Sequence, residues 1–260
     1  MDSFFYFYRM FLFISLQQFL YSWIALAIVL FPLQLFVSAP YGRHTKTTWG
    51  PMLSNKLGWV LMESWALVTF WVVYMLYFNR NNYALSFATL YTLHYIHRSF
   101  IFPIRTKTKG KQMPLLIALF ALIFNSINAA CLAYFLSKVS IYPINYILSW
   151  NFVLGFFLFF AGAFINIKSD SILINLRKPG ETDYKIPQGF LFKYVSCPNH
   201  FGEIIEWLGF MLMVWNLAGV AFFVWTASNL LPRAMHHHKW YKQRFKDYPN
   251  ERNAVLPFLL

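Results

Sequence analysis

Charge and cysteine are both scarce in this sequence. Only 12% of its 260 residues are Asp, Glu, Lys or Arg, and it has two cysteines, Cys131 and Cys197. Two cysteines give neither a disulfide framework nor the ligand spacing of a metal centre, so we expect no metal. With 58% hydrophobic residues as well, the chain is too apolar for a soluble domain of this length. The net charge of +13 does not imply nucleic acid, because basic loops of membrane proteins carry such a surplus.

The sequence contains several long runs of apolar residues. Several approach the ~20 residues that a helix needs to cross the ~30 Å hydrocarbon core of a bilayer. We therefore predict an all-α integral membrane protein in one domain, residues 1–260. The first five spans are predicted at about 11–38, 57–78, 83–102, 115–135 and 146–167. The fifth helix is expected to continue to Arg177, where Lys178-Pro179-Gly180 would end it.

The last apolar stretch, Phe201 to Leu231, is long for one span and short for two, and the basic residues decide between them. Nineteen of the 22 Lys and Arg residues fall in four segments, 43–56, 98–111, 168–193 and 233–252. Basic loops tend to face the cytoplasm, and the last segment joins the other three only if 201–231 crosses twice. The sequence therefore predicts seven transmembrane helices, an extracytoplasmic N-terminus, a cytoplasmic C-terminus and a break near Asn216 to Gly219.

Two of the predicted spans carry polar side chains that lipid does not require. Glu63 lies about six residues into the second span, roughly 9 Å deep at 1.5 Å per residue, so it is either an interhelical clamp to an arginine or a functional group. In the third span Tyr91, His94, Tyr95 and Arg98 are spaced i, i+3, i+4 and i+7 and share one helical face. Tyr95 and a protonated Glu63 would give two hydrogen-bond donors for one carbonyl oxygen. An interfacial aromatic belt also explains the two tyrosines.

The region from 166 to 206 is the most polar part of the chain between apolar runs. Asn166, Asp170 and Arg177 share a face of the extended fifth helix. They suit a nucleotide, or they form a solvated helix end with an ion pair between Asp170 and Arg177. Asn199 is expected to be the N-cap of the sixth span. Glu203 and Glu206 would then lie in its first two turns, where the helix dipole favours acidic side chains; this explains Glu203 and, more weakly, Glu206.

The C-terminal segment adds a second polar face. Arg233, His237 and Tyr241 are spaced i, i+4 and i+8 and suit the phosphates of a dinucleotide, while the rest of this basic helix is typical of one that meets lipid headgroups. The consecutive His236, His237 and His238 point about 100° apart on a helix and cannot all bind one metal. There is no glycine-rich phosphate loop, so a nucleotide would be held by side chains and helix ends.

Together these motifs resemble those of the steroid 5α-reductase family, the 3-oxo-5α-steroid 4-dehydrogenases. The resemblance runs from about Tyr41 to Leu260. It is carried by YGRHT (41–45), Glu63, HYIHRSF (94–100), the block from INIKSD (165–170) through LRKPGETDYKIPQG to NHFGEIIEW, and RAMHHHKWY with DYP. It implies a seven-helix membrane enzyme that reduces the Δ4 double bond of a 3-oxo-Δ4-steroid by hydride transfer from NADPH to C5. Helices at about 11–135 would bind the substrate and residues at about 146–260 the cofactor.

The resemblance also implies roles for individual residues. Glu63 and Tyr95 would hold the C3 carbonyl and stabilise the enolate. NADPH would be bound by the residues that match the family's cofactor set: Arg98, Asn166, Asp170, Arg177, Tyr184, Asn199, Glu203, Arg233, His237 and Tyr241. We expect a monomer among membrane lipids, in the endoplasmic reticulum if the source is eukaryotic or the inner membrane if bacterial, with a site open to the cytoplasmic side.

Rival interpretations stay open. Met62 stands where vertebrate steroid enzymes often carry Gln, and Lys168 where His is common, so the natural substrate is not fixed. Related reductases of polyprenols, enoyl-CoA or sterols share the cofactor half, but Glu63 with HYIHR favours the steroid type because that pair addresses a ketone oxygen. An isoprenylcysteine carboxyl methyltransferase would not need so many phosphate-directed basic residues. A transporter would show internal repeats or paired broken helices.

Overall fold

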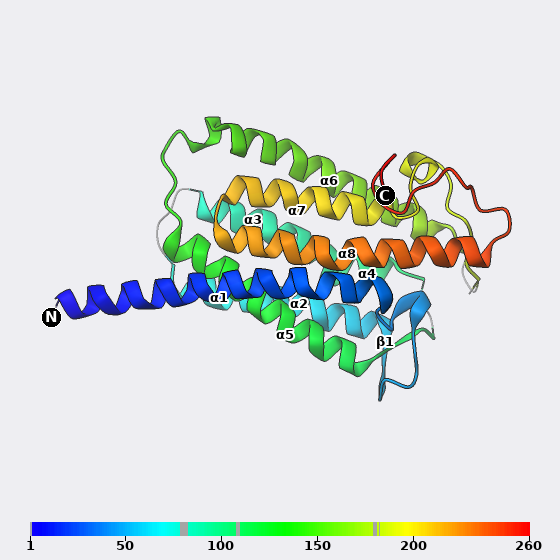
Figure 1. Cartoon of the computed structure of the whole chain (residues 1–260), viewed down its shortest axis with the longest axis horizontal. Coiled ribbons are helices and arrows are strands. Elements are labelled where there is room, and N and C mark those ends of the chain that lie inside the picture. Colours follow the sequence, from blue (N-terminus) through cyan, green and yellow to red (C-terminus); the bar gives the residue numbers. More distant parts are fainter. Residues whose placement is uncertain (1, 79–82, 108–109, 179–180, 182) are drawn as a thin grey trace.

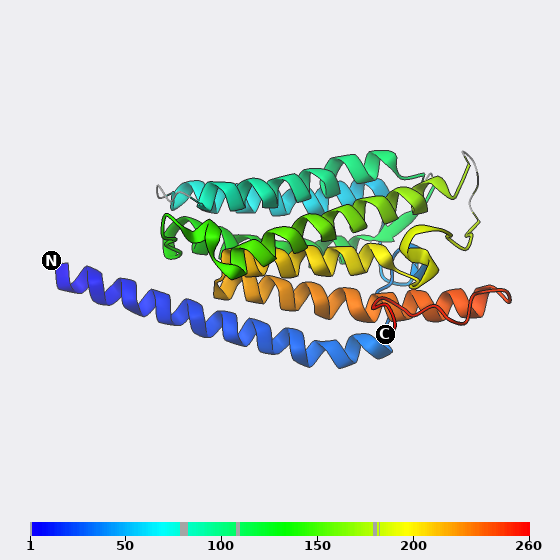
Figure 2. The same cartoon turned by 90° about the horizontal axis from the view of Figure 1, so that it is seen from above.

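The protein is a bundle of long helices that run roughly parallel or antiparallel to one another in the computed structural model (Figures 1 and 2). The structure describes residues 2–78, 83–107, 110–178, 181 and 183–260, with the backbone alone for 2–13. The longer helices are α1 (Asp2–Phe36), α2 (Asn55–Leu76), α3 (Ala84–Ile96), α5 (Leu115–Tyr134), α6 (Trp150–Asn175), α7 (Pro198–Val214) and α8 (Leu217–Arg244). The shorter elements are η1 (Gly42–His44), β1 (Met52–Ser54), η2 (His97–Ile101), α4 (Phe102–Arg105), β2 (Gln112–Pro114), η3 (Phe135–Val139), η4 (Tyr146–Leu148) and η5 (Phe190–Lys193).

Among the described residues, four helices are long and apolar enough to cross a membrane: Ile14–Phe36, Asn55–Leu76, Leu115–Val139 and Trp150–Asn175. They coincide with the first, second, fourth and fifth predicted spans. The helical class and the membrane-length apolar helices are therefore confirmed. The third, sixth and seventh spans and the orientation of the termini stay predictions.

The chain turns back on itself between α7 and α8, where the sequence predicts a break. Trp215 adopts a left-handed conformation (φ 39°) that ends α7. Asn216 then accepts a hydrogen bond from the backbone N–H of Gly219 at 2.8 Å and begins α8 as its N-cap. The two helices run side by side in opposite directions (Figures 1 and 2). The fifth helix does extend beyond its predicted span, but α6 ends at Asn175, two residues before the predicted end at Arg177; the expected stop residues Pro179 and Gly180 lie outside the described residues.

The predicted third span is not one regular helix. A π-helical turn, η2 (His97–Ile101), separates α3 from the short α4. A π turn places one extra residue in the helix and is frequent at functional sites. Because Arg98 lies inside this turn, the π geometry sets its direction relative to Tyr95.

Helices α6 and α7 approach each other closely through glycines. Gly155 and Gly162 on α6 face Gly209 and Gly202 on α7. A β-carbon at Gly155 would lie only 2.6 Å from the Gly209 carbonyl oxygen, and one at Gly162 would overlap the backbone of Glu206. Small residues at a helix crossing allow such backbone contact, and here they bring the polar end of α6 against the start of α7.

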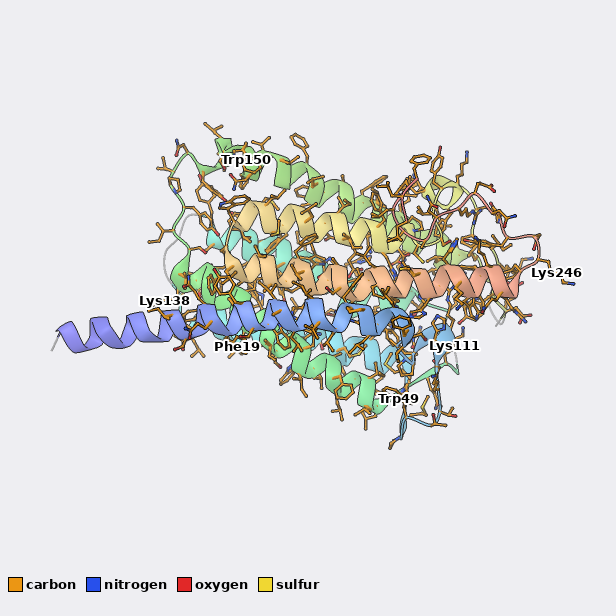
Figure 3. All side chains as sticks on the ribbon, viewed as in Figure 1. Phe19, Trp49, Lys111, Lys138, Trp150 and Lys246 are labelled. Atoms are coloured by element: carbon orange, nitrogen blue, oxygen red, sulfur yellow. The ribbon has the colours of Figure 1, made fainter. Side chains whose placement is uncertain are left out.

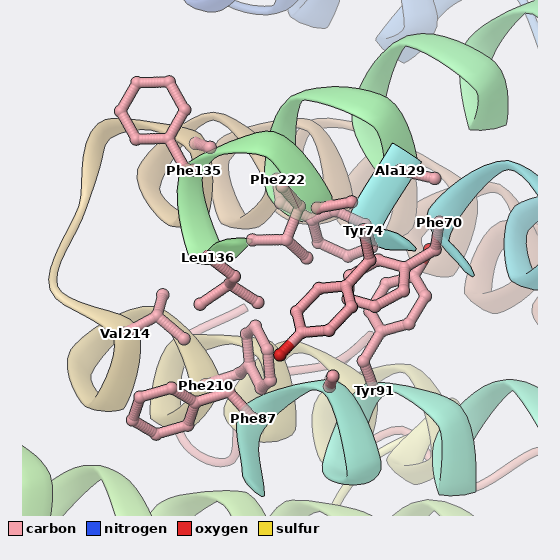
Figure 4. Packing of buried hydrophobic residues seen from close by; sticks show 14 of the residues in the cluster. Phe70, Tyr74, Phe87, Tyr91, Ala129, Phe135, Leu136, Phe210, Val214 and Phe222 are labelled. Carbon is pink, nitrogen blue, oxygen red and sulfur yellow. The ribbon is translucent and has the colours of Figure 1, made fainter. Parts of the chain in front are cut away.

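Aromatic side chains fill the middle of the bundle. Figure 4 shows Phe70 and Tyr74 of α2 packed with Tyr91 of α3, and the Phe70 and Tyr91 rings stack with centroids 4.3 Å apart. Phe87 and Phe210 continue this cluster toward α7. The buried core therefore joins the α2–α3 side of the bundle to α7 and α8, and holds the helices whose polar residues form the site.

Candidate active site

The four basic segments of the sequence meet at one end of the bundle. Lys107 donates to the carbonyl of Arg177 at 2.8 Å, and Arg105 donates to Ser171 at 3.0 Å. In Figure 3, Lys111 and Lys246 lie at this end, whereas Lys138 lies at the other. The segments thus share one end, as the charge distribution predicts.

A cavity of about 250 Å³ opens at this end and receives most of the expected cofactor residues. Its lining includes Arg98, Asp170, Arg177, Asn199, Glu203, Arg233 and His237. These residues come from η2, α6, the turn that follows α6, α7 and α8. The helices therefore bring together side chains that are more than a hundred positions apart in the sequence.

A polar network forms one wall of this cavity. Arg98 donates to Asp170 at 3.1 Å and lies 3.6 Å from Glu203. Asn199 donates to the other Asp170 oxygen at 3.1 Å. Asn166 donates to Glu203 at 3.2 Å and to the carbonyl of Asn199 at 3.0 Å. Each side chain is fixed by at least one other, so the wall is preorganised for a ligand.

Two interpretations of these residues are wrong. Asn199 is not the N-cap of α7, because the helix begins at Pro198 after Cys197 and has no side-chain cap; the Asn199 amide reaches across to Asp170 instead. Asp170 pairs with Arg98 rather than with Arg177, so these residues do not form the solvated helix end with its own ion pair.

A second cavity, of about 650 Å³, continues from the first and is strongly basic. Both cavities share Arg177, Arg233 and His237. The residues that the second cavity adds include Arg43, Lys111 and Tyr184, and none of the described residues that line this cavity is acidic. An anion is therefore the ligand that this cavity favours.

The Tyr184 ring is the centre of this basic cavity. Lys111 donates to its hydroxyl at 3.2 Å and lies 4.4 Å from the ring centre. The guanidinium carbons of Arg177 and Arg43 lie 4.5 and 5.3 Å from the same centre. Arg43 also lies over Tyr241, at 4.5 Å. Such cation–aromatic contacts hold the cations in place without neutralising them.

Arg43 and Lys111 are site residues that the sequence interpretation missed. Each lies in a basic loop outside the predicted spans, where a charged residue is ordinary. The only signal was the position of Arg43 within YGRHT. One nitrogen of the Arg43 guanidinium, Nη1, is buried without a hydrogen-bond partner among the described residues.

Histidines form the boundary of the basic cavity. The rings of His44 and His237 stack with centroids 5.2 Å apart, and His44 Nε2 lies 3.1 Å from His237 Nδ1. Burial, with the nearby Arg43 charge, lowers the pKa of His44 to about 4. Burial also lowers the pKa of His237, and Arg43 and Arg233 act in the same direction. Both rings are therefore neutral near pH 7, and the positive charge of the cavity comes from its arginines and lysine.

Glu63 and Tyr95 lie beside this network. The Glu63 carboxyl is close enough to Arg98, Glu203 and the Tyr95 hydroxyl to interact electrostatically with each of them. Tyr95 is only 6% exposed and Tyr91 is fully buried, so an interfacial aromatic belt does not explain them. Glu63 makes no ion pair within the described part of the chain, which does not support an interhelical clamp.

An ion pair joins the helix of Tyr95 to α7. His94 Nδ1 lies 2.8 Å from Glu206 Oε1, and both side chains are buried. The His94 ring packs against Tyr95 and Trp207 with centroids 5.2 and 4.6 Å apart. Glu206, for which the sequence offered only a weak helix-dipole explanation, thus connects the two groups of expected site residues.

Fold and site together define a class of protein: a bundle of membrane-length apolar helices with a preorganised polar cleft, open into a basic cavity, at one end. The family profile of 3-oxo-5-alpha-steroid 4-dehydrogenases matches residues 111–260. The chain is 43% identical over 235 residues to steroid 5-alpha-reductase DET2 of Arabidopsis thaliana, covering 86% of this chain and 88% of that protein. It is 38% identical over 231 residues to 3-oxo-5-alpha-steroid 4-dehydrogenase 1 of Rattus norvegicus, covering 86% and 87%. The human protein of that name is 38% identical over 225 residues, covering 84% and 85%. The chain belongs to this family of oxidoreductases, which confirms the resemblance.

Proposed function

We propose that this protein reduces the Δ4 double bond of a 3-oxo-Δ4-steroid to the 5α-dihydrosteroid, with NADPH as the reductant. The observation that supports this most directly is the junction of Glu63 and Tyr95 with the Arg98–Asp170–Glu203 network. In this proposal, the Glu63–Tyr95 side of the junction would bind the ketone and the Arg98–Asp170–Glu203 side would bind the dinucleotide. Membership of the family supports the same reaction.

The residues present fit NADPH. The buried, unpartnered Nη1 of Arg43 lies in a cavity that also contains Lys111, Arg177 and Arg233. Guanidinium groups recognise phosphate through paired hydrogen bonds, so this cavity suits the 2′-phosphate and the pyrophosphate. The amides and carboxylates of Asn166, Asp170, Asn199 and Glu203 suit the hydroxyls and amide of the nicotinamide half. Tyr184, His237 and Tyr241 complete the proposed set.

NADPH, when bound, supplies the hydride for C5. The work of the protein is then at the C3 oxygen, where negative charge develops. A protonated Glu63 carboxyl and the Tyr95 hydroxyl would both donate hydrogen bonds to that oxygen and stabilise the enolate until C4 gains a proton, which completes the reduction. Donors preorganised in a water-poor site are worth more than donors in water. The His94–Glu206 pair holds the helix of Tyr95 against α7. It would therefore keep Tyr95 at a fixed position relative to the proposed cofactor residues of α7.

We further propose that the upstream helices, about 11–135, enclose the steroid and that residues at about 146–260 bind the cofactor. The protein would act as a monomer surrounded by lipid, with seven crossings and the basic end toward the cytoplasm. A eukaryotic source would place it in the endoplasmic reticulum and a bacterial source in the inner membrane.

The test is product analysis with purified protein, NADPH and testosterone or progesterone. Mass spectrometry should identify the 5α-dihydro product. Glu63→Gln and Tyr95→Phe should each lower kcat by about 10²–10³-fold, the range measured for oxyanion donors, while NADPH still binds. Normal turnover by both variants would exclude the catalytic assignment. Equal use of NADH would contradict the role given to the basic cavity.

A related enone remains the second candidate, because Met62 replaces the amide that vertebrate steroid enzymes often carry before the glutamate. The Met62 side chain is buried, at 5% exposure, and packs with Met113 and Ala118. A panel of enones that includes polyprenol and enoyl substrates separates the two: preferred reduction of a non-steroid would favour this candidate.

A further inference from the structure

A third cavity, of about 750 Å³, lies on the other side of the His44–His237 pair from the basic cavity. Its residues come from the end of α1, the loop around His44, the outer part of α8 and the C-terminal segment: Leu35, Phe36, Ser38, His44, Lys46, Met235, His236, His238, Lys239, Trp240, Gln243, Asn253, Ala254 and Leu260. It shares no lining residue with either of the cavities assigned to the cofactor. The proposed reaction gives it no role.

The three consecutive histidines divide between the cavities. His237 lines the two cofactor cavities, whereas His236 and His238 line the third. His236 lies 2.8 Å from the carbonyl oxygen of Gln34 at the end of α1. His238 lies 2.6 Å from the Ser196 hydroxyl. Both side chains therefore have structural partners, and they make the third cavity a formed feature rather than a gap between mobile side chains.

The third cavity combines cations with apolar surface. Lys46 and Lys239 are exposed at its rim, and among its described lining residues no side chain is acidic. The backbone oxygen of Leu260 accepts hydrogen bonds from the amides of Val255 and Leu256, each at 2.7 Å. Burial lowers the pKa values of His44 and His238, with the neighbouring Arg43 and Lys242 charges acting in the same direction. The two lysines are therefore the lining side chains that carry a fixed positive charge near pH 7.

The apolar part of the cavity belongs to a membrane-length helix. The apolar window of α1 ends at Phe36, which lines the cavity and is 84% exposed. Leu33 and Val29, one and two turns before it on the same face, are 58% and 63% exposed. A strip of exposed apolar side chains thus leads along α1 directly to the two lysines, at the level where hydrocarbon gives way to headgroups.

We propose that this cavity binds an anionic phospholipid. The headgroup phosphate would lie between Lys46 and Lys239, and the acyl chains would cover Phe36, Leu33 and Val29. A free phosphate ion would use the lysines but leave this apolar strip uncovered, so the lipid is the occupant that uses the whole site. Because the stacked His44–His237 pair separates this site from the cofactor cavity, the bound lipid would also hold His44 against His237.

The test is a titration of the purified full chain in neutral detergent with a short-chain phosphatidylglycerol, followed by native mass spectrometry. A lysine near an anionic headgroup strengthens binding by roughly fivefold, so Lys46→Gln with Lys239→Gln should weaken it by roughly 25-fold. The matched control is Lys193→Gln with Lys246→Gln, two exposed lysines that line none of the three cavities. The control should bind as the wild type does.

Two further arms decide the nature of the ligand. Phosphatidylcholine of equal chain length should bind at least about tenfold more weakly than phosphatidylglycerol, because the net charge of its headgroup is zero. Inorganic phosphate in excess should not displace the lipid. Unchanged binding by the double variant, equal binding of the zwitterionic lipid, or displacement by phosphate would each overturn the proposal. None of these measurements depends on turnover, so they stand apart from the proposed reaction.

Discussion

Two helix interfaces in this molecule are built in opposite ways. The α6–α7 interface, beneath the proposed cofactor site, is a backbone contact through glycines at Gly155, Gly162, Gly202 and Gly209. The contacts of α1, α2 and α5, upstream, use large side chains and single hydrogen bonds. There, the Trp23 indole of α1 donates to Asn128 of α5 at 3.2 Å, and its ring centre lies 6.4 Å from that of Phe124.

This difference in packing indicates which half of the helix bundle tolerates a change of shape. Glycines in backbone contact leave no room for any added atom, so α6 and α7 hold one fixed distance. Large side chains can be exchanged for others of similar volume at modest cost. In the proposed cofactor half, the distance between the helices is thus fixed. The proposed substrate half can instead change its side chains to fit a different lipophilic substrate.

The largest expected effect comes from adding one methyl group to the glycine interface. In Gly162→Ala the new β-carbon would overlap the Glu206 backbone, which cannot move aside as a side chain can. We expect a loss of about 3 kcal/mol or more, a fall in Tm of roughly 10 °C and the loss of NADPH binding. Thermal unfolding and NADPH titration would measure both.

The matched control is Gly58→Ala on α2, in the upstream half. Its β-carbon would meet only the flexible Met113 side chain, with the sulfur 2.5 Å away. We expect folded protein that binds NADPH normally. If the two alanine variants behaved alike, the contrast between the interfaces would fail.

The next effect concerns the ion pair that joins the two regions. Removing one partner of a buried pair leaves an uncompensated group and costs about 3–5 kcal/mol. Glu206→Gln should therefore lower Tm strongly, and so should His94→Gln, because both side chains are buried and their paired atoms lie 2.8 Å apart. The double variant should be more stable than the sum of the two losses predicts, which a double-mutant cycle would measure. Additive losses would mean that the pair does not couple α3 to α7.

The smallest effect is a pH dependence from His44 at the histidine wall. The pKa of His44 is lowered to about 4 in the folded state, from an ordinary value of 6.5. Between those values the unfolded chain binds more protons, so stability falls as pH decreases from about 7 toward 4. His44→Gln removes this contribution, and its Tm should fall less than that of the wild type between pH 7 and pH 5. Equal slopes for the two proteins would show that the ring is protonated in the folded state as well.

The helical class, the break at Asn216 and the length of α6 could be predicted, because apolar runs and basic loops determine them locally. The π turn could not, since its sequence, HRSFI, has no local signal against an α-helix. Arg43 and Lys111 were missed because their importance depends on Tyr184, which is distant in sequence. Asn199 was misassigned for the same reason: a residue beside a helix start is a good cap, but a buried partner on another helix competes for its amide.

The π turn at His97–Ile101 also constrains how this chain can vary in length. A π turn is an α-helical turn with one inserted residue, and each residue advances a helix by about 100°. Deleting one residue here would leave an unbroken helix that is equally apolar, yet Arg105 and everything after it would rotate by about 100° relative to Tyr95. Most loops of a membrane protein accept insertions and deletions, but at this position the residue count itself is functional. Natural variation should therefore exchange side chains within 97–101 while keeping their number at five.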